Sequence, residues 1–298
     1  EKSWAYNQDQ LPSTHPIWAE MNDLEDVEVN FDGITYAKGA SVLRQLVAWV
    51  GQENFLAGVA AYLKKHEWGN TVLDDLLVEL EASSGRELGK WAQVWLQSSG
   101  VNTLRPVIET KDRDGIEVFM RVAIAQEPDA SSKLLRPHRL AVGCYSIEGG
   151  RLALTRRIEL DVEGELTEVP ELTGAARPEL LLVNDGDLAY AKIRLDEVSL
   201  ATATEHLALF ESSLARSLVL AAAWDMTRDG EWPASRFVDL VLRSIGAITD
   251  STVIMVLLRQ LTTAVQHYSA PARRGELAEQ VGTRLAALAA EAEPGSDL

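Results

Sequence analysis

The stretch Phe31-Asp32-Gly33-Ile34-Thr35-Tyr36-Ala37-Lys38-Gly39-Ala40-Ser41-Val42-Leu43 has the pattern of the opening of an amphipathic helix. Asp32 is placed to cap it, because its carboxylate can accept hydrogen bonds from the free N–H groups of the first turn. Gly39 costs about 1 kcal/mol inside a helix relative to alanine, which predicts a close neighbour at that position. The apolar residues share one helical face, and we expect that face to pack on the core: Tyr36, Ala40, Leu43, Val47 and Val50.

Tyr36 has two interpretations that its spacing leaves open. As a packed aromatic residue it would lie on the core with its hydroxyl satisfied, and as a functional residue it would direct that hydroxyl out of the helix start. The segments Tyr36-Ala37-Lys38-Gly39-Ala40 and Ser13-Thr14-His15-Pro16-Ile17 together resemble the gluzincin aminopeptidases, the aminopeptidase N group, and most closely its bacterial members of actinobacterial type. In that family the tyrosine of a Tyr-x-Lys-Gly-Ala helix donates a hydrogen bond to the oxyanion of the tetrahedral intermediate. The resemblance therefore implies a catalytic Tyr36, although Ala37 stands where the family often has glutamate.

Composition excludes several classes of protein. A net charge of −17 over 298 residues argues against a nucleic-acid binder, which must replace phosphate counterions with lysine and arginine, and against an anionic membrane surface. No apolar run approaches the roughly 18 residues of a membrane span. Cys144 is the only cysteine, so no intrachain disulfide can form, which is typical of a reducing compartment. We expect a cytoplasmic monomer without nucleic-acid or membrane partners.

Both ends of the chain have the character of a longer protein's interior. The chain opens at Glu1, without an initiator methionine or a signal peptide, on Lys2-Ser3-Trp4-Ala5-Tyr6. It closes on the ragged segment Glu293-Pro294-Gly295-Ser296-Asp297-Leu298. We therefore expect a fragment or a processed chain whose last domain is truncated.

The hydrophobic period changes twice, which predicts a multidomain α+β protein. Residues 1–103 have helical spacing, and the resemblance implies that they form the helical back half of a thermolysin-like catalytic domain. Residues 104–197 alternate as strands, with hairpin turns at Asp114-Gly115 and Gly149-Gly150, and predict a small antiparallel β-sandwich. Residues 198–298 are helical again, with a spacing typical of an α-solenoid or a helical bundle, and the helix lengths together with the resemblance imply a solenoid-like α-helical domain.

Within residues 1–103, local signals predict where helices begin and end. Gly51 and Gly85 should each follow a helix, and Thr71 with Asp74 should form a capping box. Trp91 and Trp95 fit a core stripe better than a ligand site. One acidic cluster is either a solvated loop or the source of a carboxylate for a substrate ammonium group: Asp23, Glu25, Asp26 and Glu28.

The sequence contains no zinc motif. A zinc peptidase needs two histidines one turn apart with a glutamate between them, H-E-x-x-H, and a downstream carboxylate. In His66-Glu67-Trp68-Gly69-Asn70 an asparagine stands where the second histidine should be. The family's Gly-Ala-Met-Glu-Asn motif for the substrate amino terminus is absent as well. The histidines are far apart: His15, His66, His138, His206 and His267.

Two polar segments have simple structural interpretations. His15 should be a loop histidine that bonds to backbone ahead of Pro16. Arg136-Pro137-His138-Arg139 should be a solvated approach to a strand, a basic spot in an acidic chain.

Two hypotheses of different classes follow. In the first, the chain is the C-terminal portion of a zinc-dependent aminopeptidase that removes N-terminal residues from peptides, with Tyr36 stabilising the oxyanion. The zinc ligands then lie outside this chain, which binds no cofactor and is inactive alone. In the second, the chain is a non-catalytic binding or scaffold module built from a β-sandwich and helical repeats. A scaffold has no evident chemical need for the Tyr-x-Lys-Gly helix.

Overall fold

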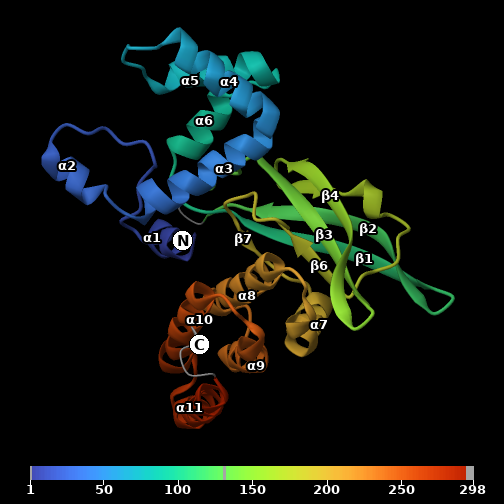
Figure 1. Ribbon diagram of the computed structural model, residues 1–298. Coiled ribbons are helices and arrows are strands. Elements are labelled where there is room, and N and C mark those ends of the chain that lie inside the picture. Colours follow the sequence, from blue (N-terminus) through green and yellow to red (C-terminus); the bar gives the residue numbers. More distant parts are fainter. Residues whose placement is uncertain (1, 130–131, 293–298) are drawn as a thin grey trace.

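Helices flank two β-sheets in the computed structural model, which describes residues 2–129 and 132–292. The predicted ragged tail, residues 293–298, lies outside the described residues. Figure 1 shows the N-terminal helices at the top and left, the sheets at the right and the C-terminal helices at the bottom. This is a mixed α+β fold, as predicted. No helix in the described parts of the chain is both long and apolar enough to cross a membrane.

Six helices form the N-terminal part, with a π-helical turn at Ile34–Lys38 leading into the third. Gly51 and Gly85 follow the ends of α3 and α5 at positive φ, as predicted. The predicted Thr71 capping box is wrong by one residue, because α5 begins after Val72, whose amide donates to the Asp75 carboxylate. The bounds are α1 (Lys2–Asp9), α2 (Leu24–Val29), α3 (Gly39–Val50), α4 (Gln52–Lys65), α5 (Leu73–Ser84) and α6 (Gly89–Leu96).

The buried face of the π-helical turn and α3 matches the predicted one only at its end, where Val50 is buried. Tyr36 and Leu43 are 48% and 55% exposed, whereas Lys38 and Gln45 are fully buried. The hydrophobic pattern did not indicate this face because it includes polar residues. Each of them has a partner: the Gln45 amide, for example, donates to the Arg139 carbonyl oxygen of the neighbouring sheet. Gly39 meets only ordinary van der Waals neighbours, the nearest being Ile17, so the prediction of a tight contact there is also wrong.

At Gly58, helices α4 and α5 pack too closely to leave room for a side chain. A Cβ atom built there would lie 2.8 Å from both Leu80 Cδ2 and Ser83 Oγ. We predict that Gly58→Ala lowers the free energy of unfolding by about 1–3 kcal/mol, because overpacking outweighs the gain in helix propensity. Gly282→Ala in α11, where a Cβ meets nothing within 4 Å, is the control and should raise it by about 0.5–1 kcal/mol. Urea unfolding measures both, and equal effects of the two variants would refute the close contact.

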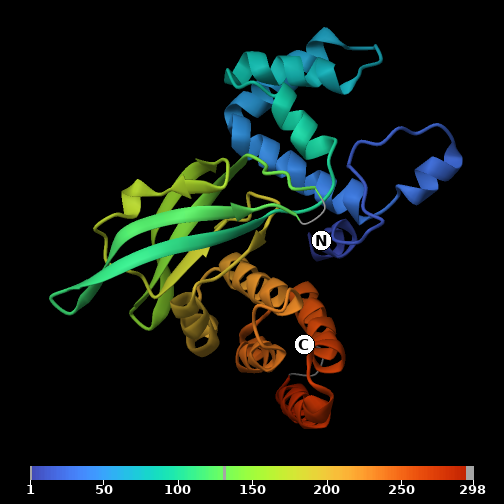
Figure 2. The same ribbon diagram turned by 180° about the vertical axis from the view of Figure 1, so that it is seen from behind.

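Two sheets pack face to face and form the predicted sandwich. One has the strand order β5-β2-β1-β7 and the other β4-β3-β6. All neighbours are antiparallel except β1 and β7, whose parallel pairing corrects the all-antiparallel prediction. Figure 2 shows the long β1-β2 hairpin from behind. The predicted turn at Asp114-Gly115 connects its two strands. The bounds are β1 (Thr103–Arg113), β2 (Ile116–Glu127), β3 (His138–Glu148), β4 (Arg151–Val162), β5 (Leu166–Glu168), β6 (Leu180–Val183) and β7 (Lys192–Ile193).

The basic segment before β3 is buried, which contradicts the predicted solvated approach. Arg136 is 1% exposed, and its guanidinium donates to Val94 and Ser99 carbonyl oxygens and to Asn102 Oδ1 at 2.7–3.1 Å. The guanidinium also lies over the Trp95 ring. His138 is fully buried, and this burial lowers its pKa to about 3. These side chains join the last N-terminal helix to the sandwich.

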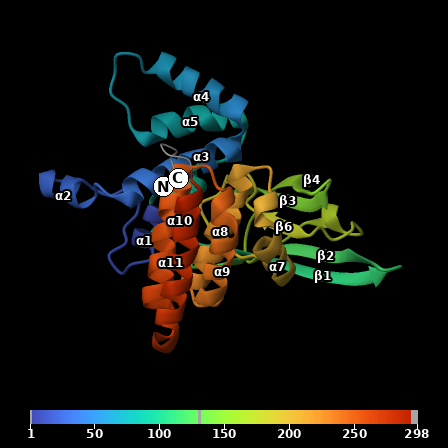
Figure 3. The ribbon, with the colours of Figure 1, turned by 60° about the horizontal axis from the view of Figure 1, so that its bottom comes forward.

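The C-terminal part is helical, as predicted, and α8, α10 and α11 each pack against α9 (Figure 3). One hydrophobic cluster runs from Leu104 in the sandwich to Leu277 in α11, and a second lies among the N-terminal helices, including Trp91 and Trp95 as predicted. Domain boundaries at 103 and 197 stay a prediction. The bounds are α7 (Glu197–His206), α8 (Ser213–Arg228), α9 (Ala234–Ser244), α10 (Ser251–Thr263) and α11 (Arg274–Glu291).

Candidate active site

Tyr36 lies in the π-helical turn that precedes α3, with its side chain half exposed. Its ring meets the Phe31 ring edge-on, at 4.8 Å between centroids. Among the described residues, no group forms a hydrogen bond with its hydroxyl. The packed interpretation of Tyr36 is therefore wrong, and the hydroxyl is available to a ligand.

Asp32 and His15 hold the start of this turn. One Asp32 oxygen accepts from the amides of Ile34 and Thr35 at 2.9 and 3.0 Å, which is the predicted capping role. The other oxygen lies 3.0 Å from His15 Nε2, while His15 Nδ1 lies 2.8 Å from the Pro16 carbonyl oxygen. The predicted backbone contact of His15 is thus present, and the structure adds an unpredicted link from the Ser-Thr-His-Pro-Ile segment to the Tyr36 turn.

Lys38, two residues after Tyr36, points in the opposite direction. Residues two apart on a helix lie on opposite sides, so an exposed Tyr36 requires an inward Lys38. The Lys38 ammonium lies 2.9 Å from Asp9 Oδ2 of α1, and neither side chain is exposed. It also donates to the Ser98 and Gly100 carbonyl oxygens at 3.3 Å. The lysine of the motif therefore anchors the turn rather than facing a ligand.

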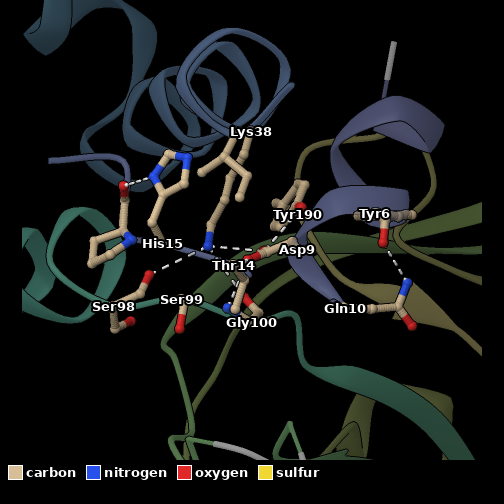
Figure 4. A network of polar contacts seen from close by, with 12 residues as sticks. Tyr6, Asp9, Gln10, Thr14, His15, Lys38, Ser98, Ser99, Gly100 and Tyr190 are labelled. Atoms are coloured by element: carbon tan, nitrogen blue, oxygen red, sulfur yellow. Dashed lines mark hydrogen bonds and ion pairs between the residues drawn. The ribbon is translucent and has the colours of Figure 1, made fainter. Parts of the chain in front are cut away.

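Asp9 accepts four hydrogen bonds, which explains how a carboxylate can be buried here (Figure 4). Besides Lys38, its donors are the Thr14 hydroxyl at 2.7 Å, the Gly100 amide at 2.7 Å and the Tyr190 hydroxyl at 3.1 Å. A buried charge is tolerated only when it is paired and hydrogen-bonded. Through Asp9 the turn that carries Tyr36 is fixed to α1, to the segment before β1 and to the segment before β7.

Burial shifts the pKa values inside this network. It lowers the pKa of Lys38 to about 8, against the opposing attraction of Asp9. Burial together with Asp9 raises the pKa of Tyr190 well above its usual value, so the phenol stays a donor. The network is a structural anchor with one charge pair at its centre.

No zinc site is formed by the residues that the structure describes. Over residues 2–129 and 132–292, no three histidine, cysteine, aspartate or glutamate side chains gather in a way that could hold a metal ion. The acidic cluster before Tyr36 is used locally, since Asp23 accepts from the Asp26 amide at the start of α2. Figure 1 shows α2 standing away from the other helices. The chemistry that the arrangement itself can supply is one rigidly placed phenol donor.

The sequence alone missed Asp9 as a member of this site. Asp9 ends a short helix with no motif around it, and its partners lie far along the chain at Lys38, Gly100 and Tyr190. A charged residue at a helix end is ordinarily solvated, so only the long-range pairing reveals its role.

Two family descriptions match the chain. Residues 1–95 match "Peptidase family M1 domain", and residues 180–298 match "ERAP1-like C-terminal domain". Aminopeptidase N of Streptomyces lividans is 55% identical over 99% of this chain and 35% of its own length. Aminopeptidase M1 of Arabidopsis thaliana is 30% identical over 63% of this chain and 20% of its own length. The tricorn protease-interacting factor F2 of Thermoplasma volcanium is 36% identical over 35% of this chain and 13% of its own length. The chain thus spans about a third or less of each of these relatives.

Proposed function

The chain belongs to peptidase family M1 as a homologue of the C-terminal portion of aminopeptidase N, and on that premise we propose that it completes the active site of an aminopeptidase. Tyr36 donates a hydrogen bond to the oxyanion that forms when water attacks the first peptide bond of a substrate. The zinc ion and the residues that hold it belong to a part of the protein outside this chain. The substrates are peptides with a free amino terminus.

The observation that carries this proposal is the contrast between Tyr36 and Lys38. The Tyr36 hydroxyl is exposed and has no partner among the described residues, while the turn that carries it is fixed by a fully buried ion pair. A donor that is fixed before the reaction pays no reorganisation cost when charge develops on the substrate. A packing tyrosine would instead have its ring buried. The arrangement supports oxyanion stabilisation over a scaffold role.

A chimera tests the proposal. We predict that this chain, joined behind the part of Streptomyces lividans aminopeptidase N that precedes the matching region, hydrolyses amino-acid anilides, because this chain supplies the missing oxyanion donor. Release of the anilide chromophore measures the rate. The chain alone and the Streptomyces part alone are the controls, and both should be inactive. A folded, metal-loaded chimera that stays inactive would contradict the proposal, as would equal activity of the Streptomyces part alone.

A further inference from the structure

A cavity of about 470 Å³ lies between the N-terminal helices, the second sheet and helices α8 and α10. Its walls are mostly aliphatic, and Tyr36 does not line it. The apolar lining comes from three parts of the chain and includes Ala37, Leu182, Leu218 and Val256. Cavities of this size, with apolar walls and a few polar groups, are typical of small-ligand sites.

Two polar side chains of the lining have no partner among the described residues. Asp225 of α8 is 6% exposed and Gln260 of α10 is 9% exposed, and neither side chain takes part in a hydrogen bond or ion pair with the described chain. Their carboxylate and amide atoms are not enclosed by protein, so these atoms face the space of the cavity. A carboxylate and an amide left unpaired in the wall of one cavity indicate a ligand that supplies hydrogen-bond donors.

The charged groups that line the cavity or surround Asp225 are engaged elsewhere. In the lining, Lys2 pairs with Asp187, and Arg44 donates to the Gly186 carbonyl oxygen. Arg194 pairs with Asp229 and Glu231, and Lys192 pairs with Asp229. Arg228 donates to the Tyr6 carbonyl oxygen. Arg194 Nη1 is itself without a partner in the described chain, but no Arg194 nitrogen is within 4.0 Å of the Asp225 carboxylate.

We propose that this cavity binds an alkylammonium ion, whose ammonium group pairs with the Asp225 carboxylate while its aliphatic chain lies against the apolar wall. An ammonium group carries three donors and no acceptor, which suits an unpaired carboxylate and the Gln260 amide oxygen. A metal ion fits less well, because no group of three metal-ligating side chains occurs in the described parts of the chain. The proposal does not depend on the role of Tyr36.

The affinity of the cavity for an ammonium group should depend on pH, because Asp225 titrates. Burial raises its pKa to about 7, against the attraction of Arg194, Lys192 and Arg228 and with the repulsion of Asp229. The nearby Tyr6 hydroxyl donates to the Ala191 carbonyl oxygen, and its pKa is raised well above the usual value by burial and by Asp225, so it stays neutral. Below pH 7 a proton therefore competes with the ammonium group for the carboxylate, and above pH 7 the carboxylate is free to pair.

Calorimetric titration of the 298-residue chain with hexylamine, hexanol and hexanoate tests the proposal. At pH 8 we expect hexylamine to bind at least tenfold more tightly than the other two, since a charge-assisted hydrogen bond is worth about that factor or more. Asp225→Asn should weaken hexylamine at least tenfold, and Asp239→Asn, the same change at an exposed ion pair on α9, should not. Nα-acetyl-lysine amide carries the same alkylammonium group as part of a peptide-like molecule. Its binding, compared with that of hexylamine, shows whether the cavity takes a lysine side chain or only a free amine.

The pH series on the unsubstituted chain keeps the test independent of how the variant folds. Hexylamine affinity should fall about tenfold per pH unit below pH 7 and level off above it. Hexanol binding as tight as hexylamine, or hexylamine binding that is flat between pH 5 and pH 8, would overturn the proposal. Unchanged hexylamine binding by a folded Asp225→Asn variant would overturn it as well.

Discussion

Tyr36→Phe is expected to lower kcat of the assembled aminopeptidase by about 10²–10³ and to leave KM nearly unchanged, which is the usual cost of one lost oxyanion donor. The phenol contacts charge that exists only in the transition state, so its loss should not weaken substrate binding. The substitution removes a single oxygen that has no partner in the described chain, and the ring contact with Phe31 remains. Steady-state kinetics of the chimera measure both constants.

Tyr268→Phe is the matched control for this prediction. Tyr268 is 40% exposed and its hydroxyl has no hydrogen bond within the described residues, so the same oxygen is removed from a similar surface. We expect its kcat to stay at the unsubstituted level. Equal kcat for the two variants would remove Tyr36 from the active site, and a change confined to KM would make it a substrate-binding residue instead.

Lys38→Met is expected to lower the free energy of unfolding by about 3–5 kcal/mol, because it leaves the Asp9 charge buried without its cation. Asp9→Asn should lower the free energy of unfolding by a similar amount, because it leaves the Lys38 ammonium buried without its anion. The double variant Asp9→Asn/Lys38→Met should lose less than the sum of the two, since no uncompensated charge remains. Urea unfolding of the chain at pH 7 measures all three.

Lys65→Met provides the comparison at an exposed ion pair. Lys65 lies 2.6 Å from Glu79, with 58% of its side chain exposed, and we expect no measurable loss of stability. Additive losses in the Asp9/Lys38 double variant would mean that the two residues do not act as a pair. Because the pair fixes the Tyr36 turn, a folded Lys38→Met chimera should also lose turnover.

How far the sequence predicts this fold is clearest at α3. Glycine signals placed its end at Gly51, because a left-handed terminal residue is a local requirement. The buried face was predicted wrongly, since Lys38 and Gln45 are buried with distant partners and a hydrophobic pattern cannot register polar groups that are satisfied by tertiary contacts. The same reason hid the burial of Arg136.

The sequence predicted one residue of the candidate site, Tyr36, but not the residues that hold its turn in place. Tyr36 came from the motif resemblance, because spacing alone left a packed ring and a functional hydroxyl both open. Asp9 and Asp225 could not be predicted, since their significance depends on which segments meet around them. Turns and strand periodicity depend on short stretches of sequence, whereas the burial of a charge depends on contacts made across the whole fold.

The role of Tyr36 as oxyanion donor is tested most sharply by the inhibition constant of a phosphinic dipeptide, measured on the chimera with and without Tyr36→Phe. A tetrahedral phosphinate presents the oxygen that the oxyanion would occupy, while a matched planar peptide inhibitor does not. We expect the variant to bind the phosphinate about 10²–10³ times more weakly and the planar inhibitor equally well. Equal phosphinate inhibition of the two proteins would contradict the assignment of Tyr36 as the oxyanion donor.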